Sequence, residues 1–137
     1  MMVGRISRVM AFTALAFSVL ACLGVPQSLD HAQAGAALRY WATVDNPFPF
    51  PGPGRFVTVT GYFTVDGQPA KGIHMATVWR SRNAIGYCYG VTAGDGTAHC
   101  TRQVTSPLML IGTSVEISVS FTFRGKQYST ATDVLPV

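Results

Sequence analysis

The chain has 137 residues, of which 48% are hydrophobic and 12% charged, and its formal net charge is +4. This length leaves room for a single folded domain. The ten basic residues are spread along the chain without a Lys/Arg run, so we expect no nucleic acid as a partner.

The N-terminal part of the chain has the pattern of an export signal. Two arginines form a positively charged start, residues 9–25 are mostly apolar, and the Ala-Gln-Ala sequence at residues 32–34 is typical of a cleavage site. We therefore predict a signal peptide at residues 1–34 and a mature domain at residues 35–137. An uncleaved anchor is the alternative, although the apolar run is at the short limit for a membrane-spanning helix.

The Val-Leu-Ala-Cys sequence at residues 19–22 indicates a second processing route. It resembles a bacterial lipobox, whose cysteine becomes the lipid-modified first residue, so Cys22 is a candidate lipidation site. Leu20 is bulkier than usual at its position and the apolar run continues past Cys22, which favours cleavage after residue 34. We expect a secreted or extracellular protein, or a membrane-tethered one if Cys22 is lipidated or the signal stays uncleaved.

A proline-rich loop at residues 46–54 follows the first predicted strand, residues 37–44. Prolines at alternate positions block ladder hydrogen bonds and favour an extended, stiff conformation. Phe48 and Phe50 in this loop are candidate binding residues, because exposed aromatic side chains on a stiff loop lose little entropy on binding. We favour the alternative that both fold back and plug the open end of a β-sandwich, since exposed apolar patches are uncommon on soluble monomers.

Residues 56–65 and 114–123 carry the clearest strand pattern in the chain. In both segments apolar residues alternate with threonine, serine and other polar residues, which is typical of half-buried antiparallel strands. Weaker patterns of the same kind predict further strands at residues 37–44, 73–80, 85–91, 97–104 and 127–134. No stretch shows a sustained helical period, so we expect little or no helix.

Trp79 lies in phase with Ile73, Met75 and Thr77 on the predicted strand at residues 73–80. This position favours a core tryptophan of the kind that packs the middle of sandwich domains. A sugar-stacking platform is the weaker alternative for the same side chain. Nearby Arg80 and Arg82, together with Arg102, are expected to form a solvated basic surface.

Cys88 and Cys100 are the two cysteines of the predicted mature domain. An even pair in an exported domain usually forms a disulfide. A hairpin turn centred on Gly94 would place the two residues opposite each other and close enough to bond. Tyr87 and Tyr89 flank Cys88 and point to the opposite face, so they are exposed candidate binding residues if Cys88 faces inward.

Seven short strands with regular turn signals predict an all-β fold, an immunoglobulin-like β-sandwich of about seven antiparallel strands. Three segments also resemble bacterial immunoglobulin-like domains of the invasin/intimin type. They are residues 57–78, where a strand runs into Asp-Gly and then Pro-Ala-Lys-Gly, the Thr-Ala-Gly-Asp-Gly-Thr-Ala turn at residues 92–98, and Gly112 before a long strand. The resemblance implies a sandwich found on bacterial surfaces, without catalytic residues. This chain departs from the adhesins of that type in having one such domain, where they string several together.

The sequence offers no pattern for catalysis, a metal or another cofactor. The mature part has two histidines, His74 and His99, and no Gly-x-Ser-x-Gly nucleophile motif. A copper site would need His, Cys and Met close together, but no histidine lies between Cys100 and Met109, and His99 should face away from Cys100. We therefore expect neither an enzyme nor a metalloprotein.

The function predicted from the sequence is an exported binding or adhesion module that acts without catalysis. Its partner would be an unidentified protein or glycan at the cell surface, and the mature chain is predicted to have no integral membrane segment. The alternative is a structural or accessory subunit of a cell-surface assembly, in which a partner completes an edge strand by β-augmentation.

Overall fold

The computed structural model describes residues 35–137, so the predicted signal peptide and Cys22 lie outside the described residues. The described part contains eight strands and no helix. They are β1 (Leu38–Val44), β2 (Phe56–Val65), β3 (Gln68–Pro69), β4 (His74–Arg80), β5 (Ile85–Val91), β6 (Thr97–Gln103), β7 (Val115–Phe123) and β8 (Lys126–Val134). All seven predicted strands are present, and the two-residue β3 is the one that the sequence pattern missed.

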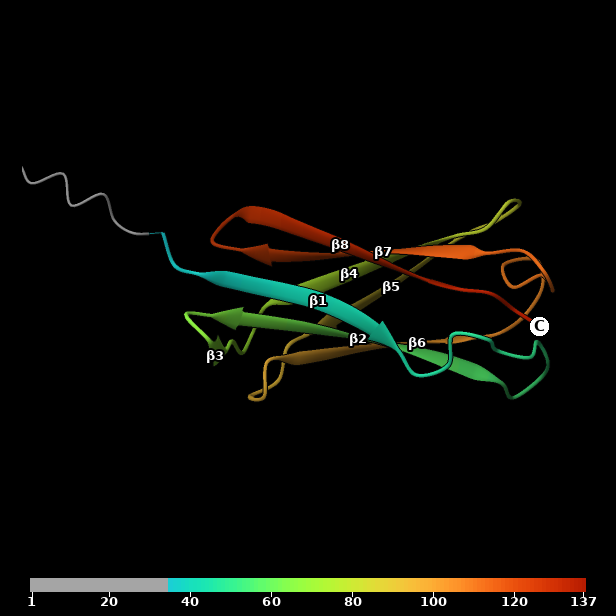
Figure 1. The fold of residues 1–137 in the computed structure, drawn as a ribbon, viewed down its shortest axis with the longest axis horizontal. Coiled ribbons are helices and arrows are strands. Elements are labelled where there is room, and N and C mark those ends of the chain that lie inside the picture. The colour runs from blue at the N-terminus through green and yellow to red at the C-terminus, as the bar shows by residue number, and fades with distance from the viewer. Residues whose placement is uncertain (1–34) are drawn as a thin grey trace, which may run out of the picture. The chain divides into compact units, whose positions relative to one another are not determined.

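The strands form two antiparallel sheets that pack face to face (Figure 1). One sheet has the order β1-β2-β6, with β3 paired to the end of β2, and the other has the order β5-β4-β7-β8. This arrangement is the expected immunoglobulin-like sandwich. If the two-residue β3 is left out, β5 is the fourth strand of the sandwich. In the constant type of immunoglobulin domain the fourth strand belongs to the sheet of the first, second and fifth strands, whereas here β5 pairs with β4 of the other sheet.

The core fills the space between the two sheets and is built from alternate residues of the long strands. On β7 the buried residues are Val115, Ile117, Val119 and Phe121. Trp79 on β4 is fully buried as well, which confirms its predicted place in the core. Gly61 on β2 faces inward, where an added Cβ atom would lie 2.8 Å from Cζ of Phe121. The core is therefore packed tightly enough that β2 has no room for a side chain at this position.

The link between β5 and β6 crosses from one sheet to the other, so the predicted hairpin is wrong. β5 pairs with β4, and β6 pairs with β2. The Gly-rich sequence of residues 93–96 is typical of a hairpin turn, but here it joins two edge strands that lie beside each other in different layers. The predicted disulfide still forms, because the Cα atoms of Cys88 and Cys100 are 5.9 Å apart across these edges.

Asp95 organises this link by accepting two hydrogen bonds from Thr97. The Thr97 hydroxyl donates to Oδ1 of Asp95 at 2.7 Å, and the Thr97 backbone N–H donates to the same oxygen at 3.0 Å. These bonds favour the charged carboxylate, so they lower the pKa of Asp95, the hydroxyl bond having the largest effect.

We predict that Thr97→Val raises the pKa of Asp95 towards the usual range of an aspartate, because it removes the hydroxyl donor. In the parent protein the bonded Asp95 stabilises the fold above its unfolded-state pKa, and this stabilisation is lost as the pH falls through the lower folded-state pKa. A carboxyl-group NMR titration of both proteins measures the shift. An unchanged Asp95 pKa in the variant would contradict this account, and Thr97→Ser, which keeps the hydroxyl, is the control.

Residues 35–137 include no helix that is long and apolar enough to cross a membrane.

Candidate functional site

The outward face of β5 carries four large apolar side chains in a row. They are Ile85, Tyr87, Tyr89 and Val91, and 58%, 55%, 74% and 52% of their respective surfaces are exposed. We call these four residues the β5 row. An edge strand that places only large apolar side chains in solvent is unusual, because scattered single residues are the norm on soluble domains. The row is therefore the first candidate for a binding surface.

The inward residues of β5 explain why its large side chains face out. Gly86 and Gly90 have no side chains, and Cys88 between them is held by the disulfide. A Cβ atom added to Gly86 would lie 2.8 Å from Cζ of Arg102, and one added to Gly90 would lie 3.0 Å from the His99 carbonyl oxygen. Because β6 fills the space beneath β5, only the outward positions have room for bulky residues.

A hollow of about 240 Å³ lies beside the β5 row on the same face. It is lined by His74, Met75, Ala76, Tyr89, Gly90, Val91 and Thr122. The small side chain of Ala76 lies beside its strand neighbour Tyr89, so the surface drops next to the tyrosine ring. An apolar floor with an imidazole, a hydroxyl and a phenol near its rim suits a partner side chain that is apolar with one polar atom.

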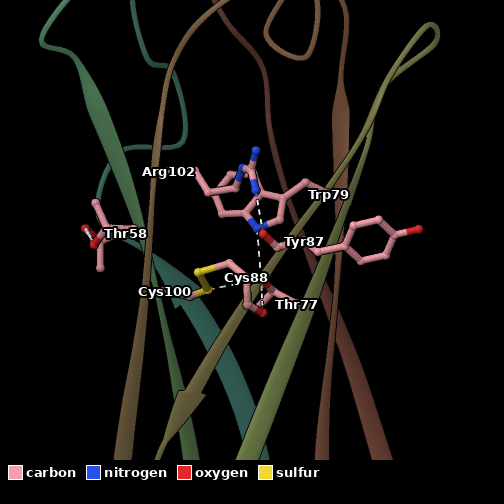
Figure 2. The surroundings of a disulfide bond; sticks show 8 residues. Thr58, Thr77, Trp79, Tyr87, Cys88, Cys100 and Arg102 are labelled. Carbon is pink, nitrogen blue, oxygen red and sulfur yellow. Dashed lines mark hydrogen bonds between the residues drawn. A yellow bond between two sulfur atoms is a disulfide. The ribbon is translucent and has the colours of Figure 1, made fainter.

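A buried polar network on the inward side of β5 holds this strand in place (Figure 2). Trp79 Nε1 donates to Oγ1 of Thr77 at 2.9 Å, and the same hydroxyl donates to the Cys88 carbonyl oxygen at 3.2 Å. The Thr77 hydroxyl also lies 3.2 Å from Sγ of Cys100, so one side chain connects β4 to both halves of the disulfide. Satisfied buried networks of this kind favour a single rigid arrangement, and β5 is therefore a firm base for its outward side chains.

Two of the three arginines expected to form one basic surface, Arg80 and Arg102, lie in different environments, and the third, Arg82, is exposed. Arg80 faces outward, donates to the Ser118 hydroxyl at 2.9 Å and lies 4.0 Å from Glu116. Arg102 instead turns inward between β6 and β5, where its Nη1 donates to the Tyr87 carbonyl oxygen at 2.5 Å. The prediction of a single solvated basic surface is therefore wrong, because the glycine at residue 86 gives Arg102 room to lie beneath β5.

Phe48 and Phe50 lie away from the β5 row. Their loop pairs with the segment after β8, since Leu135 N–H donates to the Pro47 carbonyl oxygen at 2.8 Å and Val137 N–H donates to that of Pro49 at 3.2 Å. β8 and β5 are at opposite edges of their sheet. Both phenylalanines are exposed, by 59% and 65%, and Pro49 between them is buried. The alternative that they plug the sandwich is therefore contradicted.

The outward face of the other sheet is rich in hydroxyl groups. Thr58 and Thr101 share a hydrogen bond of 2.9 Å, and Thr60 lies 3.0 Å from Nδ1 of His99. His99 does face away from the buried Cys100, as the alternation predicts. No cluster of three metal-ligating side chains occurs within residues 35–137. This face therefore contrasts with the apolar surface on β5.

Sequence reasoning found Tyr87 and Tyr89 but missed the residues around them. Ile85 and Val91 complete the row, while His74 and Thr122 border the hollow. The signal for the first two was available, because every second residue of residues 85–91 is large and apolar while those between are Gly, Cys and Gly. The hollow depends on pairing between three strands, and the sequence does not specify that pairing.

No known protein family matches the chain, and no curated protein is significantly similar to it.

Proposed function

We propose that the protein is an exported binding module that acts without catalysis, and that the β5 row with its adjacent hollow contacts the partner. The observation that carries the proposal is the exposure of four large apolar side chains on one edge strand. Tyrosines contribute large contact areas at low entropic cost and are enriched at protein interfaces. The disulfide beneath the row supports the proposal further, since a rigid base reduces the entropy lost on binding.

The partner that best suits this surface is a protein with an apolar patch. Ile85 and Val91 at the two ends of the row present only aliphatic groups, which an apolar protein side chain covers better than a sugar ring does. Arg80, the strand neighbour of Ile85, lies close to Glu116 and bonds to Ser118, so its charge is partly balanced beside the row. The predicted export signal and the resemblance to invasin/intimin-type domains support a partner at the bacterial cell surface.

Replacing Tyr89 by alanine is expected to weaken binding to intact cells of the protein's own host by at least about tenfold, as for an aromatic interface anchor. The thermal unfolding midpoint should stay unchanged, because the Tyr89 side chain is 74% exposed. Fluorescently labelled protein titrated onto the cells gives the affinity. Phe50→Ala, at an exposed aromatic residue outside the row, is the matched control and should leave binding unchanged.

Pretreatment of the cells identifies the class of partner. Protease treatment should abolish binding, whereas mild periodate oxidation of surface sugars should not. Loss of binding only after periodate would replace the protein partner by a glycan. Equal binding by Tyr89→Ala and the parent protein would refute the proposed surface altogether.

An accessory subunit of a surface assembly is the second candidate function. The observation that favours it is the position of β5 at the edge of its sheet, where a strand from another chain could add to the ladder.

A further inference from the structure

The free edge of β5 presents unpaired backbone groups. The turns on either side of the strand show which residues these groups belong to. Thr92 N–H donates to the Ile73 carbonyl oxygen, and Ser81 N–H donates to that of Ala84. Along an antiparallel ladder, residue pairs that exchange hydrogen bonds alternate with pairs that do not. Between these two turns, the pairs that exchange hydrogen bonds with β4 therefore involve Gly86, Cys88 and Gly90 of β5. The backbone groups of the β5 row therefore point away from β4.

This edge lacks the devices that usually protect exposed strands. Natural edge strands carry lysines, prolines or bulges that block pairing with another chain. The seven residues of β5 include no charged residue and no proline. At the other edge of the same sheet, β8 carries Lys126 and Asp133 and lies beside β1. On β5 the Arg102 guanidinium bonds to one carbonyl group, that of Tyr87, and a carbonyl oxygen accepts a second hydrogen bond readily.

The sequence of β5 is nearly palindromic about Cys88. It reads Ile-Gly-Tyr-Cys-Tyr-Gly-Val, so residues of the same class stand at equal distances on both sides of the cysteine. Two copies of this strand paired antiparallel about Cys88 would set Tyr87 opposite Tyr89 of the second copy, and Ile85 opposite Val91. Aromatic and β-branched residues paired across strands are favourable. The occupant that this edge matches best is therefore a second copy of the same strand.

We infer that the protein forms a two-fold symmetric homodimer in which the β5 strands of two copies pair antiparallel about Cys88. The pairing joins two four-stranded sheets into one continuous sheet and gives partners to the free backbone groups of the β5 row. The two rows meet on one outward face, so the dimer doubles the apolar surface. The inference goes beyond the proposed function and is tested without any ligand.

The mass of the folded protein in solution tests the dimer. Protein expressed from the full sequence should have twice the chain mass by light scattering and dissociate on dilution. Ile85→Lys/Val91→Lys should be a monomer, because the pairing brings the introduced lysines of the two copies face to face. Ile85→Lys/Val91→Glu should remain a dimer, because the same register then pairs opposite charges. Both positions are more than half exposed, so neither variant should disturb the fold.

The control variant, Thr43→Lys/Thr101→Lys, places two lysines on the outward face of the other sheet and should remain a dimer. A monomeric parent protein, or a dimer that survives Ile85→Lys/Val91→Lys, would overturn the inference. If Ile85→Lys/Val91→Lys and Ile85→Lys/Val91→Glu dissociate equally, the proposed pairing register about Cys88 is wrong. Hydrogen exchange adds a site-specific readout, since the Tyr89 and Val91 amides should be protected in the parent protein and exchange rapidly in the monomeric variant.

Discussion

Trp79→Ala is expected to lower the free energy of unfolding by about 3–5 kcal/mol, the usual cost of deleting a large buried aromatic side chain. Trp79 is fully buried, and its Nε1 donates to the Thr77 hydroxyl in the network beneath the disulfide. A domain of this size has a total stability of roughly 5–15 kcal/mol, so the variant should lose a large share of it. Urea denaturation followed by circular dichroism measures the loss.

The chain's other tryptophan provides a matched control for this prediction. Trp41 lies on the outward face of β1, is 42% exposed and stacks on Tyr62 with 4.8 Å between the ring centroids. Trp41→Ala should therefore cost much less than the same change at Trp79. Trp79→Phe should fall between the two, because it keeps most of the buried ring but removes the indole N–H. Similar losses for Trp41→Ala and Trp79→Ala would show that Trp79 does not anchor the core.

Removing the disulfide with Cys88→Ala/Cys100→Ala is expected to cost about 3 kcal/mol, as estimated from the entropy of closing a loop of this length. The cysteines are 12 residues apart in the sequence and link edge strands of different sheets. Denaturation of the parent protein with and without a reductant should show the same loss, and the double variant should not respond to the reductant. Free thiols at both cysteines in protein freshly recovered from its host would contradict the prediction.

The strands were predictable from the sequence because burial on one face of a sheet imposes a two-residue period. β2 and β7 show this period with hardly an exception, and their predicted limits agree with the structure to within one residue. β3 escaped prediction since Gln68-Pro69 is too short to show any period. The placement of Trp79 in the core followed from its phase with three other residues of the same strand.

The assignment of strands to sheets was not predictable in the same way. A Gly-rich link after a strand is compatible with a hairpin and with a crossing between layers, because the turn residues satisfy the same local geometry in both cases. β5 shows the difficulty most clearly, since its apolar residues lie on the outward face and only the disulfide marks the inward one. The hollow beside it depends on the neighbouring strands β4 and β7, so local sequence alone could not reveal it.

The disulfide between the two sheet edges also determines how the domain would respond to a pulling force. The N-terminal start of β1 and the end of the chain after β8 lie at opposite ends of the domain (Figure 1). A load between them would act along the strands and shear β1 against β2 and β7 against β8. The covalent link would keep residues 88–100 closed, so the stretched chain would be about 35 Å shorter than its full contour length. Single-molecule extension before and after reduction would record this difference directly.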